Sequence, residues 1–253
     1  MFGLKTDLAR ECLYRFFSVA VTEPSDSNWV CVLNPENQRL AAASVDFLRE
    51  AAEKTIESIL PALTLEPLFD GLQQSIDILH DEYQRVFGLT PARECPPFEV
   101  EYHTNTEPFF QSQQLADVAG FYRAFGLNPS TARASRQDHL ALELEFMAFL
   151  LMKQRQIRQT MKSDSDKTEK LAVCDQAATD FFREHIAWWV PAFATGLIRR
   201  SESGIYAELG KVLAAFFRAE CMRLGIATAR MPLAVVAPVQ AEEPTECAAC
   251  AAG

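Results

Sequence analysis

Hydrophobic side chains recur every three or four residues along most of the chain, which is the spacing of one face of an α-helix. The first such stretch, residues 4–21, aligns Leu4, Leu8 and Leu13, and it must end before Pro24. The same periodicity predicts further helices over residues 36–60, 68–87, 112–125, 136–159, 171–189 and 205–224. Because few runs of β-branched residues compete with this pattern, the sequence predicts an all-α protein with a single bundle-like domain.

The helix over residues 136–159 carries the clearest pattern and the most unusual polar residues. Apolar side chains cover two sides of its first part, SRQDHLALELEFMAFLLM, and a helix of this kind is usually internal. Ser135 is the predicted N-cap, and Asp138 lies where an acidic side chain suits the positive end of the helix dipole. His139 and Glu143, four residues apart, form a neighbouring polar pair on this apolar surface.

The helices are separated by segments that lack apolar periodicity. Residues 88–110 hold four prolines and predict a long irregular connection, which in a compact domain is often functional. Residues 162–170, KSDSDKTEK, are too polar to be buried and predict a surface loop. Pro191 ends the helix over 171–189, and residues 193–198 form a short further segment.

The character of the chain changes after Gly225. Residues 226–253 are rich in Ala, Val, Pro and Glu and show no clean period. We therefore expect two regions, a helical domain over residues 1–225 and a flexible tail over 226–253.

Charge and composition narrow the function. The 253 residues carry 34 acidic and 24 basic side chains, and the net charge of −10 disfavours nucleic acid and favours a cationic partner. No apolar run is long enough for a membrane span, and charged residues interrupt the N-terminal segment where a signal peptide needs an apolar core. Seven cysteines lie mostly within helical patterns, which fits a reducing cytoplasm.

The residues offer little support for catalysis. His139 and Glu143 have the spacing of a metal-binding pair, but zinc needs three or four ligands and no second histidine completes the motif. Cys247 and Cys250 could hold a metal or form a redox pair, so a metal or redox carrier is the alternative function. His185 with Trp188 and Trp189 fits core packing better than a binding platform. We predict no enzyme and no cofactor.

Four motifs, in order, resemble the TorD/DmsD/NarJ-like chaperones that mature molybdenum-cofactor oxidoreductases. The first is an aromatic-x-x-L-F motif, matched by residues 83–87 with Val86 in place of the usual Leu. The second is P-[YF]-E-x-x-Y at residues 97–102, the third is D-H-x-x-x-E at residues 138–143, and the fourth is FFREHIAW at residues 181–188. The resemblance spans roughly residues 8–220.

The resemblance implies an all-helical cytoplasmic chaperone that binds the twin-arginine leader peptide, and often the precursor, of the catalytic subunit of a molybdoenzyme. By motif match, the residues linked to leader recognition are Asp138, His139, Glu143, Pro97, Phe98, Glu99 and Tyr102. We expect a monomer or a domain-swapped dimer.

A twin-arginine leader presents two adjacent cations followed by an apolar segment, so its receptor needs acidic residues beside apolar ones. Asp138, Glu143, Glu99 and Glu101 beside Phe98 and Phe146 form such a set. We predict a peptide groove in which these carboxylates hold the arginine pair and the aromatic rings hold the apolar segment. His139 and Glu143 form its polar rim.

Overall fold

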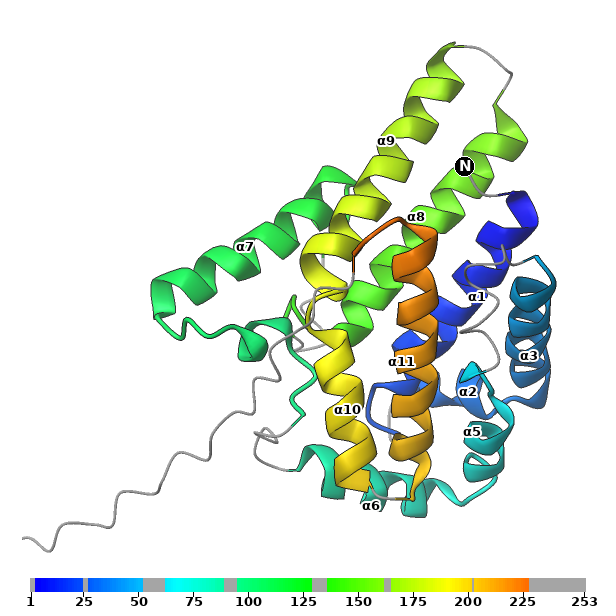
Figure 1. Cartoon of the computed structure of the whole chain (residues 1–253), viewed down its shortest axis with the longest axis vertical. Helices are drawn as coiled ribbons and strands as arrows, with labels where there is room; N and C mark the ends of the chain where they lie inside the picture. Colours follow the sequence, from blue (N-terminus) through cyan, green and yellow to red (C-terminus); the bar gives the residue numbers. More distant parts are fainter. Residues whose placement is uncertain are drawn as a thin grey trace, which may run out of the picture.

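The computed structural model describes residues 3–24, 27–51, 62–88, 95–128, 136–161, 165–201 and 203–227. Within these ranges all regular secondary structure is helical, and the one β-type contact is an isolated antiparallel bridge between Phe98 and His139. The prediction of an all-α fold is confirmed. Figure 1 shows the helices gathered into one bundle, from which α7 projects to the side.

The bundle is built around the first helix. Helix α1 (Leu4–Ala20) packs against α8 (Leu140–Thr160) and α3 (Pro35–Glu50), with η1 (Ser27–Trp29) and α2 (Val30–Leu33) in the connection. α3 begins where Asn34 accepts a hydrogen bond from the Glu36 N–H at 2.8 Å and Pro35 occupies the first turn. The first part of the helix predicted over residues 36–60 is α3, and its remainder, from residue 52 on, lies outside the described residues.

The single helix predicted over residues 68–87 is wrong. The chain instead forms α5 (Glu66–Gly71) and α6 (Ile76–Phe87), and Ser75 is the N-cap of the second helix. The apolar spacing through Leu68, Leu72 and Leu79 continues across the break, because all three side chains lie in the same core. Periodicity alone therefore did not indicate the turn at residues 72–75.

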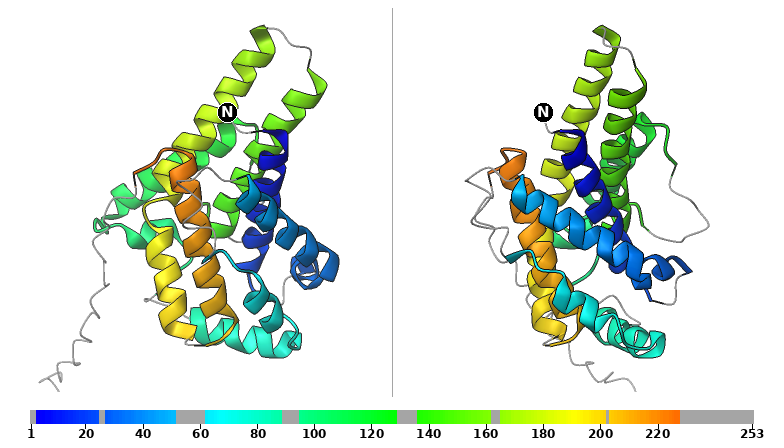
Figure 2. Two further views of the ribbon diagram at one scale, coloured as in Figure 1. Left: turned by 45° about the vertical axis from the view of Figure 1, so that its right-hand side comes forward. Right: turned by 90° about the vertical axis from the view of Figure 1, so that its right-hand side faces the viewer.

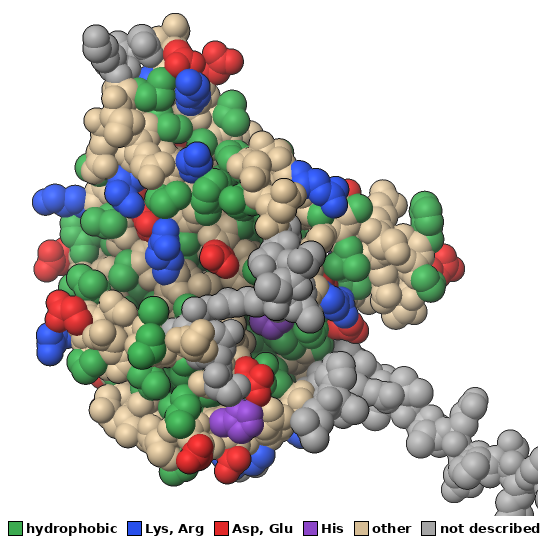
Figure 3. Space-filling view, turned by 180° about the vertical axis from the view of Figure 1, so that it is seen from behind, with side chains coloured by type: hydrophobic (Ala, Val, Ile, Leu, Met, Phe, Trp, Pro, Cys, Tyr) green, Lys and Arg blue, Asp and Glu red, His purple; other side chains and the backbone are tan. Residues whose placement is uncertain are grey.

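Helix α7 (Pro108–Ala124) begins four residues before the predicted start at Ser112, because Pro108 suits the first turn of a helix. It ends, as predicted, before Gly126, whose φ of +74° lies in the left-handed region. Figure 3 shows hydrophobic side chains at the free end of this projecting helix, where Phe109 is 82% exposed. Most of α7 is thus separated from the core, and its buried residues are Val118, Ala119 and Tyr122.

Helices α8 and α9 (Ser165–Phe181) form a long pair that extends beyond the other helices (Figure 2). The polar residues from Ser165 onward were predicted to form a surface loop, but they are the first turns of α9. They are at the surface as predicted, yet a fully polar helical turn carries no apolar stripe by which the sequence pattern could reveal it.

The last helices form the other half of the bundle. A π-helical turn, η4 (Phe182–Ile186), follows α9 directly, and α10 (Val190–Ser201) packs on α11 (Ile205–Arg223). The break predicted before Pro191 is present, because α10 starts at Val190, but α10 is longer than the short segment predicted over 193–198. The last helix agrees with its prediction to within one residue.

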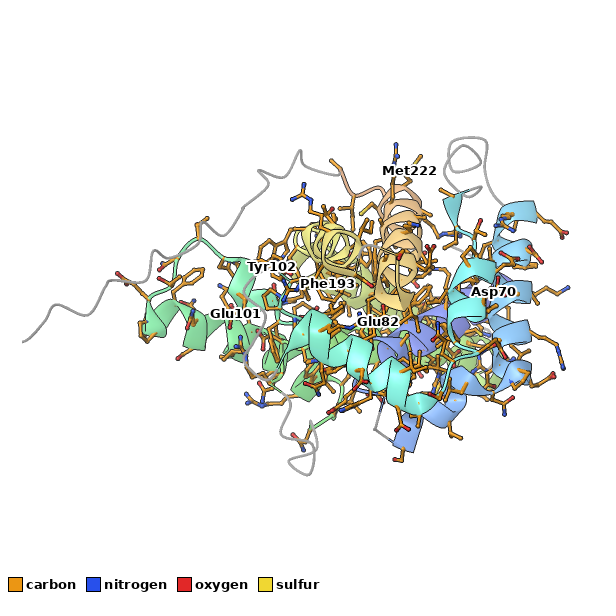
Figure 4. The ribbon with its side chains drawn as sticks, turned by 90° about the horizontal axis from the view of Figure 1, so that it is seen from below. Asp70, Glu82, Glu101, Tyr102, Phe193 and Met222 are labelled. Carbon is orange, nitrogen blue, oxygen red and sulfur yellow. The ribbon has the colours of Figure 1, made fainter. Side chains whose placement is uncertain are left out.

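A side chain from α6 caps the start of α11. The Glu82 carboxylate accepts a hydrogen bond from the Ser201 hydroxyl at 2.7 Å and another from the Tyr206 N–H at 3.2 Å. Figure 4 shows Glu82 on α6, beneath the ends of α10 and α11. A Cβ atom at Gly204 would lie 1.8 Å from Glu82 Oε1, so only glycine leaves room for this contact.

A buried ion pair joins the first and last helices. The Arg10 guanidinium donates three hydrogen bonds of 2.7 to 3.0 Å to the carboxylate of Glu220. The Tyr14 hydroxyl donates a further one at 2.8 Å. Both charged side chains are almost fully buried, so they are compensated by each other rather than by water.

The C-terminal tail predicted over residues 226–253 lies, from residue 228 on, outside the described residues. Its separation from the domain over 1–225 stays a prediction. Within the described ranges none of the helices has the length and apolar character that a membrane crossing requires.

Candidate functional site

Two of the motifs meet at the start of α8. Phe98 and His139 form the antiparallel bridge, the Glu99 N–H donates to the Asp138 carbonyl at 3.0 Å, and the Leu140 N–H donates to the Pro97 carbonyl at 2.9 Å. The 3₁₀ turn η3 (Glu99–Tyr102) follows at once. The structure thus brings together Pro97, Phe98, Glu99, Asp138 and His139, five of the residues named by motif match.

The predicted start of α8 is wrong. The helix begins at Leu140 rather than Arg136, and its N-cap is His139, whose Nδ1 accepts a hydrogen bond from the Ala141 N–H at 3.0 Å. Pairing with Phe98 keeps His139 in an extended conformation (ψ 131°), so the helix cannot begin earlier. The predicted cap, Ser135, lies outside the described residues.

Asp138 therefore does not lie in the first turn of α8, where it was predicted to face the positive end of the helix dipole, and its side chain has another role. Its side chain is fully buried, and Oδ2 accepts a hydrogen bond from the Val100 N–H at 3.0 Å. This bond ties the first turn of η3 to the residues that precede α8. Burial lowers the pKa of the neighbouring His139 to about 4, more than the Asp138 charge raises it, so His139 is neutral near pH 7 and accepts the hydrogen bond at its Nδ1.

Glu99 is also buried and is bound by two residues that the sequence analysis assigned to the core. The Trp188 indole donates to Oε1 at 3.0 Å, and His185 Nδ1 lies 3.1 Å from Oε2. Burial raises the pKa of Glu99, while the contacts with His185 and Trp188 oppose the shift. His185 and Trp188 are missing from the predicted site, although both lie in the fourth motif, which was the available signal.

Glu143 lies beneath these residues and has no exposed surface. Neither carboxyl oxygen makes a hydrogen bond of normal geometry, and its polar neighbours are the Glu99 carboxyl and the Trp189 indole. Burial, followed by the charges of Glu99 and Asp138, raises the pKa of Glu143 well above its ordinary value. His139 and Glu143 are neighbours through the backbone only, where the Glu143 N–H donates to the His139 carbonyl at 3.2 Å.

The buried positions of Asp138, Glu99 and Glu143 correct the predicted groove. Their carboxylates are not an open acidic rim, because all three are buried. Those of Asp138 and Glu99 also accept hydrogen bonds within the local fold, from the Val100 N–H and the Trp188 indole. Phe146 is likewise in the core. Tyr102 is half-buried, and its ring lies at an angle of 37° to that of Trp189 with 5.0 Å between the ring centroids. Burial raises the pKa of its hydroxyl.

Solvent reaches the site at Glu101 and at Arg136, which the sequence analysis placed only as the first residue of the predicted helix. Its Nε and Nη2 donate to both oxygens of Asp138 at 3.0 and 2.8 Å, and Nη1 donates to Glu101 Oε1 at 2.6 Å. The guanidinium carbon lies 4.5 Å from the centroid of the Phe98 ring. We call Phe98, Glu101 and Asp138 the arginine clamp. No periodicity or motif in the sequence singled out Arg136.

The site offers recognition chemistry. An aromatic face and two carboxylates around one guanidinium form the set of groups that binds arginine with defined geometry. Among the described residues no group of three His, Cys, Asp or Glu side chains is placed to hold a metal ion. Cys247 and Cys250, on which the carrier alternative rests, lie outside the described residues.

Comparisons with known proteins point to one family. Residues 45–195 match the family described as nitrate reductase delta subunit. Over 114 residues the chain is 28% identical to the chaperone protein TorD of Vibrio cholerae, a match that covers 45% of this chain and 46% of that protein.

Two further relatives are similar in kind. The chain is 31% identical to the selenate reductase assembly chaperone protein of Thauera selenatis, over 44% of this chain and 53% of the relative. It is 34% identical to the chaperone protein TorD of Photobacterium profundum, over 52% and 56%. The chain thus spans about half the length of each of these curated relatives.

Proposed function

We propose a function from the premise that this chain belongs to the nitrate reductase delta subunit family, as the motif resemblance predicted. It is an assembly chaperone that binds the twin-arginine leader of a molybdoenzyme and the catalytic subunit that carries this leader. Relatives named as chaperones and as assembly chaperones of selenate, chlorate and perchlorate reductases support this role. In this proposal the protein acts in the cytoplasm before export and is not an enzyme.

The observation that carries the proposal is the arginine clamp. Its three residues come from the second and third motifs, and they hold a guanidinium at a half-exposed position. Carboxylates that bind two edges of a guanidinium, with an aromatic ring on its face, select arginine over lysine because only arginine offers a planar set of donors. A twin-arginine leader presents this group.

The remaining predicted residues support the clamp in this proposal. Pro97 and His139 fix the bridge that places Phe98, and Glu99 anchors η3 to the region around α10 through His185 and Trp188. Tyr102 packs beside Trp189. Glu143 lies below them as a buried acid. The oligomeric state, monomer or domain-swapped dimer, stays a prediction.

The test uses a fluorescein-labelled peptide with two adjacent arginines ahead of an apolar Leu-Ala segment. Fluorescence anisotropy should detect binding to the whole protein, and replacing both arginines by lysine should weaken binding about tenfold or more. Phe98→Ala should weaken binding of the arginine peptide, because it removes the aromatic face of the clamp and leaves the acidic net charge unchanged.

Glu36→Gln is the control for a lost carboxylate, because Glu36 is exposed on α3 and its carboxylate pairs with Arg39 rather than with a residue of the clamp. It should leave binding unchanged, whereas Glu101→Gln should weaken it. Equal binding of the arginine and lysine peptides, or no binding of either, would contradict leader recognition at this site.

A further inference from the structure

Arg136 occupies the arginine clamp in the free protein. Its five-donor guanidinium makes two hydrogen bonds to Asp138 and one to Glu101, and its flat face lies on Phe98. Partial burial lowers the pKa of Arg136, but its hydrogen bonds to Asp138 and Glu101 outweigh this effect and the pKa is raised. The group is therefore a permanent cation that is bound by both carboxylates of the clamp.

The position is at the surface, although Asp138 is not. The side chains of Arg136 and Glu101 are 38% and 39% exposed, whereas that of Asp138 is 0% exposed. Because Asp138 exposes no surface of its own, an external guanidinium reaches this carboxylate only by taking the place of Arg136. Because the Arg136 side chain is itself 38% exposed, it can turn into solvent, and the incoming guanidinium then compensates the buried charge of Asp138 in its place.

The contact is local in sequence. Arg136 lies two residues before Asp138, outside α8, while the clamp itself is fixed by the bridge between Phe98 and His139 and by the Val100 hydrogen bond. The receptor groups are thus held by long-range contacts, and the occupant is attached by a short piece of chain. This arrangement allows the occupant to leave without disturbing the receptor.

We propose that Arg136 is an internal substitute for a peptide arginine, which it imitates in the free protein and which must displace it to bind. The inference rests on the proposed function, because it assigns the regulation of the same site. Because Arg136 occupies the clamp, the apparent affinity for a peptide arginine equals the intrinsic affinity multiplied by the fraction of molecules in which the clamp is empty. A single arginine on another protein binds too weakly to displace Arg136. A leader that adds apolar contacts binds more tightly and can displace it.

The experiment compares Arg136→Gln with the parent protein, using Arg-Arg amide dipeptide as the probe in isothermal titration calorimetry. Glutamine keeps a hydrogen-bond donor for Asp138 but removes the cation that competes for the clamp. The dipeptide should bind Arg136→Gln roughly tenfold more tightly than the parent. The added substitution Glu101→Gln should abolish this gain.

Arg39→Gln is the matched control, since it removes the same charge from an arginine that is 73% exposed and paired with Glu36 on α3. It reports how much a more acidic protein attracts any cationic peptide. If the affinity for the dipeptide rises no more in Arg136→Gln than in Arg39→Gln, the inference is wrong. Circular dichroism checks the fold, and if Arg136→Gln does not fold, Arg136→Lys replaces it, for which a smaller gain is expected because ammonium binds the clamp less well.

The fluorescein-labelled peptide with two arginines and an apolar segment, called the long peptide below, distinguishes the two proposals. If the parent binds this peptide but Arg136→Gln binds the dipeptide no more tightly than the parent does, the proposed role of Arg136 as an internal substitute is wrong. Leader recognition is then unaffected. A gain for the dipeptide without binding of the long peptide to any variant supports the exchange at the clamp and overturns leader recognition.

Discussion

Glu143 shows how a single buried carboxyl couples the site to pH. It is fully buried, it lacks a hydrogen bond of normal geometry, and the charges of Glu99 and Asp138 add to the effect of burial. The folded protein therefore holds a proton on Glu143 at pH values where the unfolded chain has lost it. A group whose pKa is raised by folding contributes its stability below the unfolded value, and that contribution is lost as the pH rises.

The replacement Glu143→Gln keeps the shape of the protonated acid and cannot ionise. Its free energy of unfolding relative to the parent should rise by about 1 kcal/mol or more between about pH 5 and pH 8. Urea denaturation at both pH values measures this difference. Glu145→Gln on the exposed side of α8 is the control and should show no such trend. A constant difference across the range would mean that Glu143 is ionised in the fold.

The site residues were predictable from the sequence only as motif members. Their contacts were not, because the partners are distant along the chain: Glu99 binds His185, and Val100 binds Asp138. The local pattern favoured Ser135 as the N-cap of α8. The N-cap is His139 instead, because its bridge with Phe98 keeps it in an extended conformation. Arg136 gave no signal because a single arginine before a helix is ordinary.

At the scale of elements, the apolar period located α1, α11 and all but the start of α8, because each of these helices buries a continuous stripe. It failed where neighbouring helices bury side chains in one core, as at the turn between α5 and α6, and where a polar helical turn has no stripe, as at the start of α9. The junction of α6 with α11 was also hidden, because it depends on Glu82 and Gly204, which are 122 residues apart by their numbers.

Gly204→Ala should destabilise the protein by about 1 to 3 kcal/mol, because the new methyl group meets the Glu82 carboxylate and the Ser201 hydroxyl, at 1.8 and 2.7 Å from Oε1 and Oγ. Thermal unfolding measures the loss. Gly120→Ala is the control, since nothing lies within 4 Å of a Cβ atom there, and its added methyl group favours the helix. Equal effects of the two changes would show that the cap is not tightly fitted.

At the scale of the whole molecule, the ion pair between Arg10 and Glu220 closes the bundle from its first helix to its last. Burial raises the pKa of Glu220, but Arg10 outweighs this effect and the pKa is lowered. A carboxylate of this kind stabilises the fold above its unfolded pKa, and its contribution is lost as the pH falls through the lower folded value.

Glu220→Gln should lower the free energy of unfolding by about 3 kcal/mol near neutral pH, because it leaves the buried Arg10 charge uncompensated by its main partner. The loss should shrink in acid, where the parent also loses the charge. Glu208→Gln, which removes a more exposed pair with Lys211 on the same helix, should cost less than about 1 kcal/mol. Comparable losses in urea denaturation would refute a special role for the buried pair.

The π-helical turn between α9 and α10 has a consequence for how this chain is aligned with its relatives. A π-turn holds one residue more than an ordinary α-helical turn, and here the Ala187 N–H donates to the Phe182 carbonyl, five residues back, at 2.8 Å. The residues before this point keep the register of α9, and the turn at residues 187–189 separates them from α10. His185 lies inside the turn and faces Glu99 in this register. In a relative with an ordinary α-helical turn at this place, the residue that occupies the position of His185 in space would therefore differ from its equivalent by residue count.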